Sequence, residues 1–191
     1  LEYIARENDY SDRDDLLHYE EKNVPKEFED GKDFVDTMEK NSRSNARLLK
    51  KYEMSLPREF SDKDNIKIAK EFCEKKFGNE YAYFLGIHNP KGNHPHLHVS
   101  VCERKLDGIE RDKEKYFKRA NTKNPEAGGI KVNEEFATEK YFENFCKDWE
   151  NHLNKNLIEN GYEKLSPKKD KFQVENKTWE VEKVRSYSKV Q

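Results

Sequence analysis

Residues 80–103, EYAYFLGIHNPKGNHPHLHVSVCE, decide how this chain folds. Residues 80–88 are aromatic or aliphatic at almost every position, which is typical of a central strand buried on both faces. Asparagine, proline and glycine follow at residues 89–93, and polar and apolar side chains then alternate over residues 96–103. Alternation predicts a strand, and the turn-forming residues predict a tight connection. We therefore expect two neighbouring strands joined as a hairpin.

Helix and strand patterns alternate on both sides of this hairpin. The patterns predict one or two helical turns at residues 2–8, a polar, weakly helical stretch at 12–21, helices at 31–50, 61–77 and 134–159, and a strand at 51–56. Ser61 with Asp64 forms an N-terminal cap for the second long helix, and Gly78 ends it. The fold class is therefore α/β or α+β, with a mostly antiparallel sheet.

The composition indicates one folded domain with a densely charged surface. The chain has 191 residues, of which 33% are hydrophobic and 40% charged, yet it carries 11 Phe, 10 Tyr and 2 Trp. Disordered chains are poor in aromatic residues. No apolar run is long enough to cross a membrane and no signal-peptide pattern is present, so we expect a soluble cytosolic protein. Cys73, Cys102 and Cys146 lie far apart, which predicts buried thiols and not a disulfide framework or a zinc site.

Charge is distributed unevenly along the chain. The formal net charge is only −2, but residues 104–123 hold eight Lys or Arg against four Asp or Glu, and residues 164–191 have the same balance. A solvated surface would explain either run. Binding to a nucleic-acid backbone is the alternative explanation.

Four of the six histidines fall within residues 88–98. Side chains two positions apart on a strand point to the same face, so His96 and His98 lie side by side. The hairpin brings His88 close to this pair. Three neutral nitrogen ligands with open positions are typical of a catalytic metal site, whereas the alternative is ordinary polar strand residues. His94, in the turn, is the weakest candidate.

A metal in such a site could serve two kinds of chemistry. It could activate a water molecule in a hydrolase, or it could hold phosphate oxygens while a side chain attacks the phosphorus. The basic residues 104–123 follow the histidine strand directly, so we expect them to place cations near the metal. That arrangement favours phosphoryl transfer on DNA.

Several blocks of the sequence, in order, resemble the plasmid mobilisation relaxases of the MobA/MobL kind, over about residues 2–130. The blocks are EYIARE at 2–7, NARL at 45–48, EMSLP at 53–57, GIH at 86–88, NHPHLH at 93–98, CER at 102–104, DGIER at 107–111, YFKRAN at 116–121 and PEAGG at 125–129. The combination is specific, although no single block is.

This resemblance implies an α+β fold of the HUH endonuclease type, with a sheet of about five antiparallel strands flanked by helices. It implies three histidines holding Mn or Mg, and a tyrosine that attacks single-stranded DNA at the nick site of an origin of transfer. The tyrosine would keep the 5′-phosphate until the strand is rejoined. Accessory mobilisation proteins and a coupling protein are the implied partners, in the cytoplasm of a bacterium that carries the plasmid.

Carried over residue by residue, the resemblance predicts the members of the site. The metal ligands are His88, His96 and His98, the nucleophile is Tyr3, the acidic residue is Glu53, and the DNA contacts are Arg104, Arg111, Lys118 and Arg119. Glu53 would accept the tyrosine proton or orient a ligand histidine. Tyr10 and Tyr19 are the neighbouring alternatives to Tyr3.

The sequence departs from the family pattern at its start. These relaxases have a strand before the catalytic tyrosine, but only Leu1 and Glu2 precede Tyr3, so we expect the first strand to lie upstream in a longer chain. We assign residues 1–160 to the relaxase domain and residues 161–191 to a basic C-terminal extension, to which we assign no role. The rival functions are a rolling-circle replication initiator, a non-catalytic DNA-binding accessory module and a metal-dependent hydrolase of small substrates.

Overall fold

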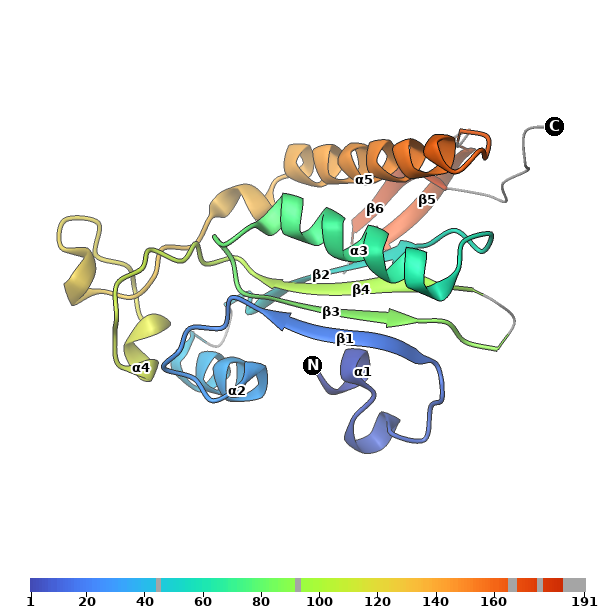
Figure 1. Cartoon of the computed structure of the whole chain (residues 1–191). Helices are drawn as coiled ribbons and strands as arrows, with labels where there is room; N and C mark the ends of the chain where they lie inside the picture. The colour runs from blue at the N-terminus through green and yellow to red at the C-terminus, as the bar shows by residue number, and fades with distance from the viewer. Residues whose placement is uncertain (44–45, 92–93, 165–167, 175–176, 184–191) are drawn as a thin grey trace.

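The predicted hairpin forms the centre of the sheet (Figure 1). The computed structural model describes residues 1–43, 46–91, 94–164, 168–174 and 177–183. Strand β3 (Tyr83–His88) is buried at every position and pairs antiparallel with β4 (His96–Cys102). In this register His88 lies opposite His96, and Gly86 lies opposite His98. The hairpin prediction is confirmed, although Gly92 and Asn93 of its turn lie outside the described residues.

The two outer strands complete a four-stranded antiparallel sheet in the part of the chain that the structure describes. Strand β1 (Leu16–Lys22) pairs with β3, and β2 (Leu49–Ser55) pairs with β4, which gives the order β1-β3-β4-β2. The predicted α+β class with an antiparallel sheet flanked by helices is therefore confirmed.

The prediction of a weakly helical stretch at residues 12–21 is wrong. From Leu16 onward these residues form β1, whose side chains are half-buried throughout. Pairing with the buried strand β3 gives the backbone amides and carbonyls of β1 their hydrogen-bond partners. This outweighs a weak local preference for helix. The segment is polar because it lies at the edge of the sheet, where Glu20 forms ion pairs with Lys22 and Lys70.

The helix predicted at residues 31–50 is too long. Helix α2 (Gly31–Asn41) ends nine residues earlier, and Leu49 already pairs with Cys102 in the sheet. Leu48 and Leu49 are apolar because they pack against the cluster beneath α2, not because they continue the helix. Residues 44 and 45 within this span lie outside the described residues.

The other two long helices form where they were predicted. Helix α3 (Asp62–Phe77) begins at Ser61, whose side chain accepts a hydrogen bond from the Asp64 amide, and it ends at Gly78, where φ is 51°. Helix α5 (Glu139–Glu159) follows the short 3-10 helix η3 (Glu134–Ala137). The remaining elements are α1 (Glu2–Ala5), η1 (Asn8–Tyr10), α4 (Lys113–Tyr116), η2 (Pro125–Ala127), and β5 (Lys168–Val174) with β6 (Lys177–Lys183), which form a separate two-stranded sheet.

The sheet lies between two layers of helices, α3 and α5 on one face and α1 and α2 on the other (Figure 1). Helices α3 and α5 cover one face, and the larger apolar core lies there, against Leu97, Val99 and Val101 of β4. His96, His98 and Ser100 alternate with these residues and therefore point to the other face. On that face α2 packs over one end of the sheet, while the short helix α1 packs on β3. The histidines thus share a face with α1.

Two of the three cysteines, Cys73 and Cys102, are buried thiols as predicted, and Cys146 is partly buried. No helix among the described residues combines the length and the apolar character that a membrane crossing needs.

Candidate active site

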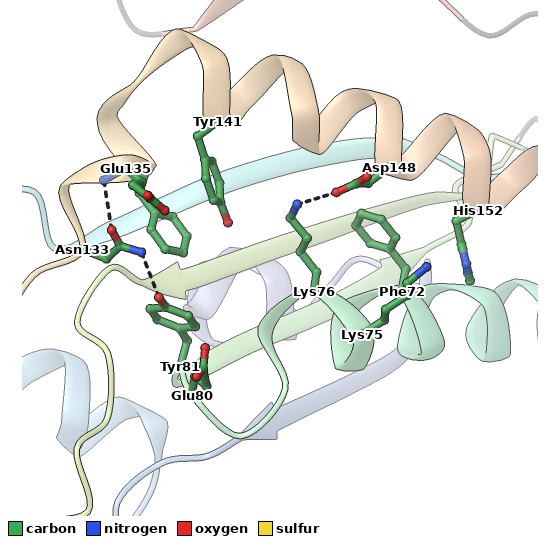
Figure 2. A pocket seen from close by; sticks show the side chains of 11 residues that line it. Phe72, Lys75, Lys76, Glu80, Tyr81, Asn133, Glu135, Tyr141, Asp148 and His152 are labelled. Carbon is green, nitrogen blue, oxygen red and sulfur yellow. Dashed lines mark hydrogen bonds and ion pairs between the residues drawn. The ribbon is translucent and has the colours of Figure 1, made fainter.

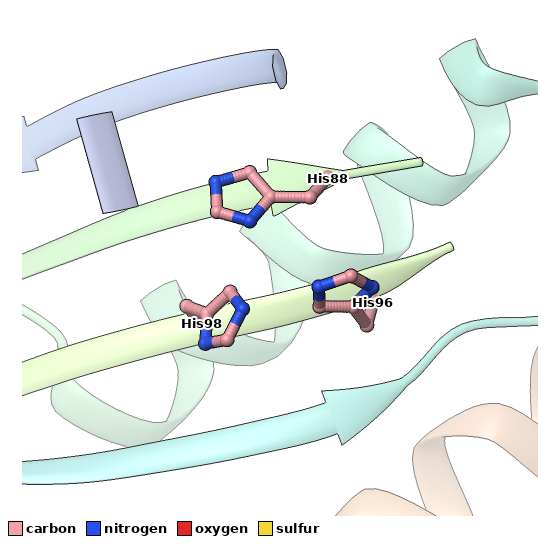
Figure 3. Close-up of side chains that lie close together, drawn as sticks. All are labelled: His88, His96 and His98. Atoms are coloured by element: carbon pink, nitrogen blue, oxygen red, sulfur yellow. The ribbon is translucent and has the colours of Figure 1, made fainter. Parts of the chain in front are cut away.

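The three predicted ligand histidines lie together at one end of the β3–β4 hairpin (Figure 3). One nitrogen from each of His88, His96 and His98 lies within 4.8 Å of the other two. The centroids of the rings are 4.8 to 5.4 Å apart. The strand register produces this cluster, because His88 faces His96 across the pair and His98 follows two positions later on the same face. We call these three side chains the histidine triad.

The hydrogen bonds of the triad leave nitrogen lone pairs directed at a common point. His88 Nε2 is 2.9 Å from the carbonyl oxygen of Ile4, and His96 Nδ1 is 2.8 Å from that of His94. A carbonyl oxygen can only accept, so these two nitrogens carry the protons and the other nitrogen of each ring keeps its lone pair. Such an arrangement is typical of metal-ligating histidines, whose second nitrogen donates to a carbonyl or carboxylate.

Two nitrogens of the triad are suited to hold a metal ion. Within the described part of the chain, His88 Nδ1 and His98 Nε2 are buried and have no hydrogen-bond partner. Buried polar atoms are nearly always paired, so an orphaned pair in one cluster indicates a site for an ion. The residues present therefore fit a divalent metal.

Burial also keeps two members of the triad, His88 and His98, in the protonation state that metal binding requires. Desolvation lowers the pKa of His88, and desolvation together with the neighbouring histidines lowers the pKa of His98 to about 3. A histidine with a lowered pKa is neutral at pH 7, and only the neutral ring offers a lone pair to a metal.

Tyr3 lies directly beside the triad, as predicted for the nucleophile. Its ring centroid is 5.3 Å from that of His98 and 6.0 Å from that of His88, in edge-to-face contacts. The side chain is 38% exposed, so a substrate can reach it. Of the two alternatives, Tyr10 packs edge-to-face against Tyr3 with centroids 5.2 Å apart, whereas Tyr19 donates its hydroxyl to Glu21. The contacts with the triad thus single out Tyr3 among these three tyrosines.

Gly86 allows Tyr3 to approach the sheet. A Cβ atom at this position would lie 2.4 Å from the carbonyl oxygen of Ile4, a distance that real Cβ atoms do not adopt. The missing side chain lets α1 rest on β3, and the same Ile4 carbonyl accepts the proton of His88. One glycine and one hydrogen bond therefore join the segment that carries Tyr3 to the histidine triad.

Glu53 lies at the rim of the triad. It sits on β2 opposite His98, and its Oε2 is 3.8 Å from His98 Nδ1. The side chain is 66% exposed. This position favours the second of its two predicted roles, the orientation of a ligand histidine, and that role stays a prediction.

The expectation that residues 104–123 place cations near the metal is wrong. Strand β4 begins at His96 and runs away from the triad, so Cys102 is six residues on, about 20 Å away. The basic segment therefore begins at the opposite end of the sheet (Figure 1). Cationic groups beside Tyr3 come instead from Arg6 and Arg13, whose guanidinium carbons lie 4.6 and 5.8 Å from the centroid of its ring.

The four predicted DNA contacts fall into two groups. Arg111 has a side chain only 1% exposed, which bonds Asp107 and the Gly128 carbonyl, and Arg104 donates to two carbonyl groups within the same long loop. Lys118 and Arg119 are exposed. The structure thus gives the first two a role in holding the loop, and DNA contact by any of the four stays a prediction.

A cavity of about 350 Å³ lies on the other face of the sheet (Figure 2). Helices α3 and α5 line it with side chains of both charges, among them Lys76, which pairs with Asp148 at 2.6 Å. The triad shares no residue with this cavity.

Comparison with known proteins agrees with this geometry. The model of the MobA/MobL family matches residues 1–178. This chain belongs to the MobA/MobL family. The resemblance noted from the sequence blocks is thereby confirmed.

Relatives of this MobA/MobL protein bear names from plasmid mobilisation. Mobilization protein A of Escherichia coli is 36% identical over 164 residues, which cover 85% of this chain and 23% of the relative. The 43 kDa relaxation protein of Salmonella typhimurium is 39% identical over 134 residues, covering 66% and 36% respectively. This chain therefore spans about a quarter of the first of these curated relatives and about a third of the second.

A solved structure shares the fold of this family member. It comes from work on the molecular basis of vancomycin resistance transfer in Staphylococcus aureus, and it superimposes with a TM-score of 0.59 at 26% identity, covering 80% of this chain and 74% of that chain.

Proposed function

We propose that this chain is the DNA-nicking domain of a plasmid mobilisation relaxase of the HUH type. Its substrate is single-stranded DNA at an origin of transfer, which it cleaves and rejoins. The observation that carries the proposal is the contact between the exposed ring of Tyr3 and the rings of His88 and His98, two histidines of one cluster that each have a buried nitrogen without a hydrogen-bond partner. Membership of the MobA/MobL family and the names of the relatives support it.

The proposed reaction is a transesterification at phosphorus. The hydroxyl oxygen of Tyr3 attacks the scissile phosphodiester, the new O–P bond forms as the bond from phosphorus to O3′ breaks, and the phenolic proton is lost while O3′ gains a proton. The 5′-phosphate remains on Tyr3 as an ester that conserves the energy of the broken bond. The reverse attack by a 3′-hydroxyl rejoins the strand and frees the tyrosine.

The triad would hold Mn²⁺ or Mg²⁺ through His88 Nδ1, the free nitrogen of His96 and His98 Nε2. A divalent ion there neutralises charge on the phosphate oxygens during phosphoryl transfer. Glu53 would fix the orientation of His98 from the rim through Nδ1. Three protein ligands leave positions open for the phosphate.

DNA that also reached Lys118 and Arg119 would have to run along the sheet. It would have to cover the distance of about 20 Å from His96 to the end of β4. Accessory mobilisation proteins and a coupling protein are the partners that we propose for the longer protein.

The decisive test is a covalent adduct. A labelled single strand carrying the origin of transfer of the cognate plasmid is incubated with the protein and Mn²⁺, and we expect a protein–DNA adduct whose nucleotide maps to the Tyr3 peptide by mass spectrometry. Tyr3→Phe removes only the hydroxyl, so it should bind the strand with unchanged affinity and form no adduct.

Each rival function predicts a different result of this experiment. A non-catalytic accessory module would bind the strand without an adduct. A metal-dependent hydrolase of small substrates would leave the strand uncleaved and form no adduct, and it would not bind the strand. A rolling-circle initiator would form its adduct on a replication origin and not on the origin of transfer.

A further inference from the structure

Arg6 makes an unusual set of contacts directly after α1. Its Nε and Nη2 atoms bond the two carboxylate oxygens of Asp15 at 2.6 and 2.9 Å. Its Nη1 atom donates to the Tyr3 carbonyl at 2.9 Å, and its guanidinium lies over the Tyr3 ring, 4.6 Å from the centroid. The residue is only 7% exposed. The Arg6 side chain thus contacts both the backbone carbonyl and the ring of Tyr3.

Asp15 connects Arg6 to the histidine triad. Its side chain holds Arg6 in a fork that fixes the guanidinium plane. Its carbonyl oxygen accepts the amide proton of Asn89 at 2.7 Å, and Asn89 directly follows the ligand His88. The hydrogen bond from Arg6 holds the pKa of the Asp15 carboxyl below its ordinary value, so the pair stays charged at neutral pH.

The backbone of Arg6 indicates that its side chain is needed. Its φ of 55° and ψ of 48° place it in the left-handed region as the C-cap of α1. Glycine or asparagine suits such a position best, because a side chain with a Cβ is strained there. Arginine is also rarely buried. A position that only ended the helix would have no reason to hold a buried arginine.

We propose that Arg6 and Asp15 are a positioning pair that holds the Tyr3 ring against the histidine triad. The inference rests on the proposed function of Tyr3 and adds two residues to it. The exposed ring could otherwise rotate about its side-chain bonds and leave the triad. The guanidinium plane closes one face of the ring, while His98 and Tyr10 meet it edge-on.

The test separates the fork from the charge. Arg6→Asn keeps a residue that tolerates the left-handed backbone but removes both fork and charge, whereas Arg6→Lys keeps the charge alone. Asp15→Asn is nearly isosteric and weakens the same pair of hydrogen bonds by removing the carboxylate. It replaces Arg6→Asn in the test if that variant does not fold. Lys76→Gln is the matched control, because it removes a 2.6 Å ion pair on the opposite face (Figure 2).

Single-turnover cleavage of the origin strand is the first measurement. We expect Arg6→Asn to slow cleavage about 100-fold, the loss typical of a reactant misplaced by about 1 Å, with DNA affinity and Mn²⁺ binding unchanged. Arg6→Lys should not restore the rate. The double variant Arg6→Asn/Asp15→Asn should cleave no more slowly than Arg6→Asn alone. Both substitutions disrupt the same Arg6–Asp15 interaction, so their effects should not add. Lys76→Gln should cleave as the wild type does.

A second measurement needs neither metal nor DNA. With 3-fluorotyrosine at position 3, the ¹⁹F signal of the wild type should lie away from that of a free tyrosine, and Arg6→Asn should move it toward the free value. A wild type that formed no adduct would overturn the proposed function, while this spectrum would still test the positioning pair.

Three results would overturn the positioning pair itself. The first is wild-type cleavage by folded Arg6→Asn or an unchanged ¹⁹F signal. The second is rescue by Arg6→Lys, which would make charge the cause. The third is a parallel loss of Mn²⁺ and DNA binding, which would make the pair a general support of the fold.

Discussion

Replacing Gly86 by alanine tests whether Tyr3, the proposed nucleophile, is held by backbone contact between α1 and β3. The added Cβ would lie 2.4 Å from the Ile4 carbonyl oxygen and 3.2 Å from its carbonyl carbon and its Cβ. Ordinary contact begins at 3.4 Å, so α1 must retreat by about 1 Å. The bond of 2.9 Å from His88 Nε2 to Ile4 would then exceed hydrogen-bond range.

The magnitudes follow from this displacement. Inserting a methyl group into a packed site costs about 1–3 kcal/mol, and a chain of this size loses roughly 2–4 °C in Tm per kcal/mol. We therefore expect Gly86→Ala to lower Tm by roughly 2–12 °C. Cleavage should fall by about two orders of magnitude, because the attacking oxygen moves by about 1 Å.

The assay is single-turnover cleavage at saturating DNA, beside thermal unfolding and titration with Mn²⁺. The triad belongs to the sheet and not to α1, so Gly86→Ala should still bind the ion. Gly108→Ala is the glycine control, because its Cβ would meet no atom within 4 Å and only its φ of 73° is strained. Wild-type cleavage and Tm in Gly86→Ala would refute the argument, since α1 could then not rest on β3 as described.

Four further perturbations address the metal, the DNA path and the edge of the sheet. His96→Ala, or chelation of the metal by EDTA, should abolish both ion binding and cleavage, and added Mn²⁺ should restore cleavage only after chelation; cleavage that survives EDTA would exclude the metal. Lys118→Ala combined with Arg119→Ala should flatten the dependence of log Kd on log salt by about 0.7 for each phosphate that these side chains neutralise, and an unchanged slope would remove both residues from the DNA path. Arg111→Gln should lower Tm without changing the slope of log Kd against log salt, because the Arg111 side chain is buried in the loop. A changed slope with an unchanged Tm would instead indicate that Arg111 contacts DNA. Burial raises the pKa of Glu20, but ion pairs with two lysines and a hydrogen bond outweigh burial and lower it to about 2, so this residue stabilises the fold above about pH 4.5 and the gain is lost as pH falls toward 2. Glu20→Gln should therefore lose stability at neutral pH and flatten the fall of Tm below pH 4.5, as thermal melts across that range will show.

Local signals in the sequence were enough for the centre of the fold and for the triad. The hairpin was predictable because its inner strand is apolar throughout and the residues between its strands are turn formers, and a period of two places His96 and His98 on one face. Helix α3 carried its own cap at Ser61 and its own stop at Gly78. The predicted place of Tyr3 beside the triad came from the family resemblance, because no local pattern distinguishes it from nine other tyrosines.

The errors arose where tertiary contacts outweigh local preference. Strand β1 has the polar composition of a surface helix, yet pairing with β3 decides its conformation. Leu48 and Leu49 continue a helical spacing, but they pack against the apolar cluster beneath α2. The position of the basic segment depends on which way β4 runs from the triad, and proximity in sequence to His98 does not reveal that direction.

The position of Tyr3, the proposed nucleophile, depends on contacts with the rest of the protein rather than on its own short helix. A helix of four residues cannot form by itself, because the first turn costs more conformational entropy than its hydrogen bonds return. Two contacts therefore have to hold Tyr3 in place, the carbonyl of Ile4 on His88 and the fork between Arg6 and Asp15. The first contact reaches His88 at the end of β3. The second reaches Asn89, the next residue, because the Asp15 carbonyl accepts the Asn89 amide. The proposed reaction must also run backwards, so it needs the same geometry after cleavage as before, and these two contacts beside the triad would hold a phosphotyrosyl ester in that geometry.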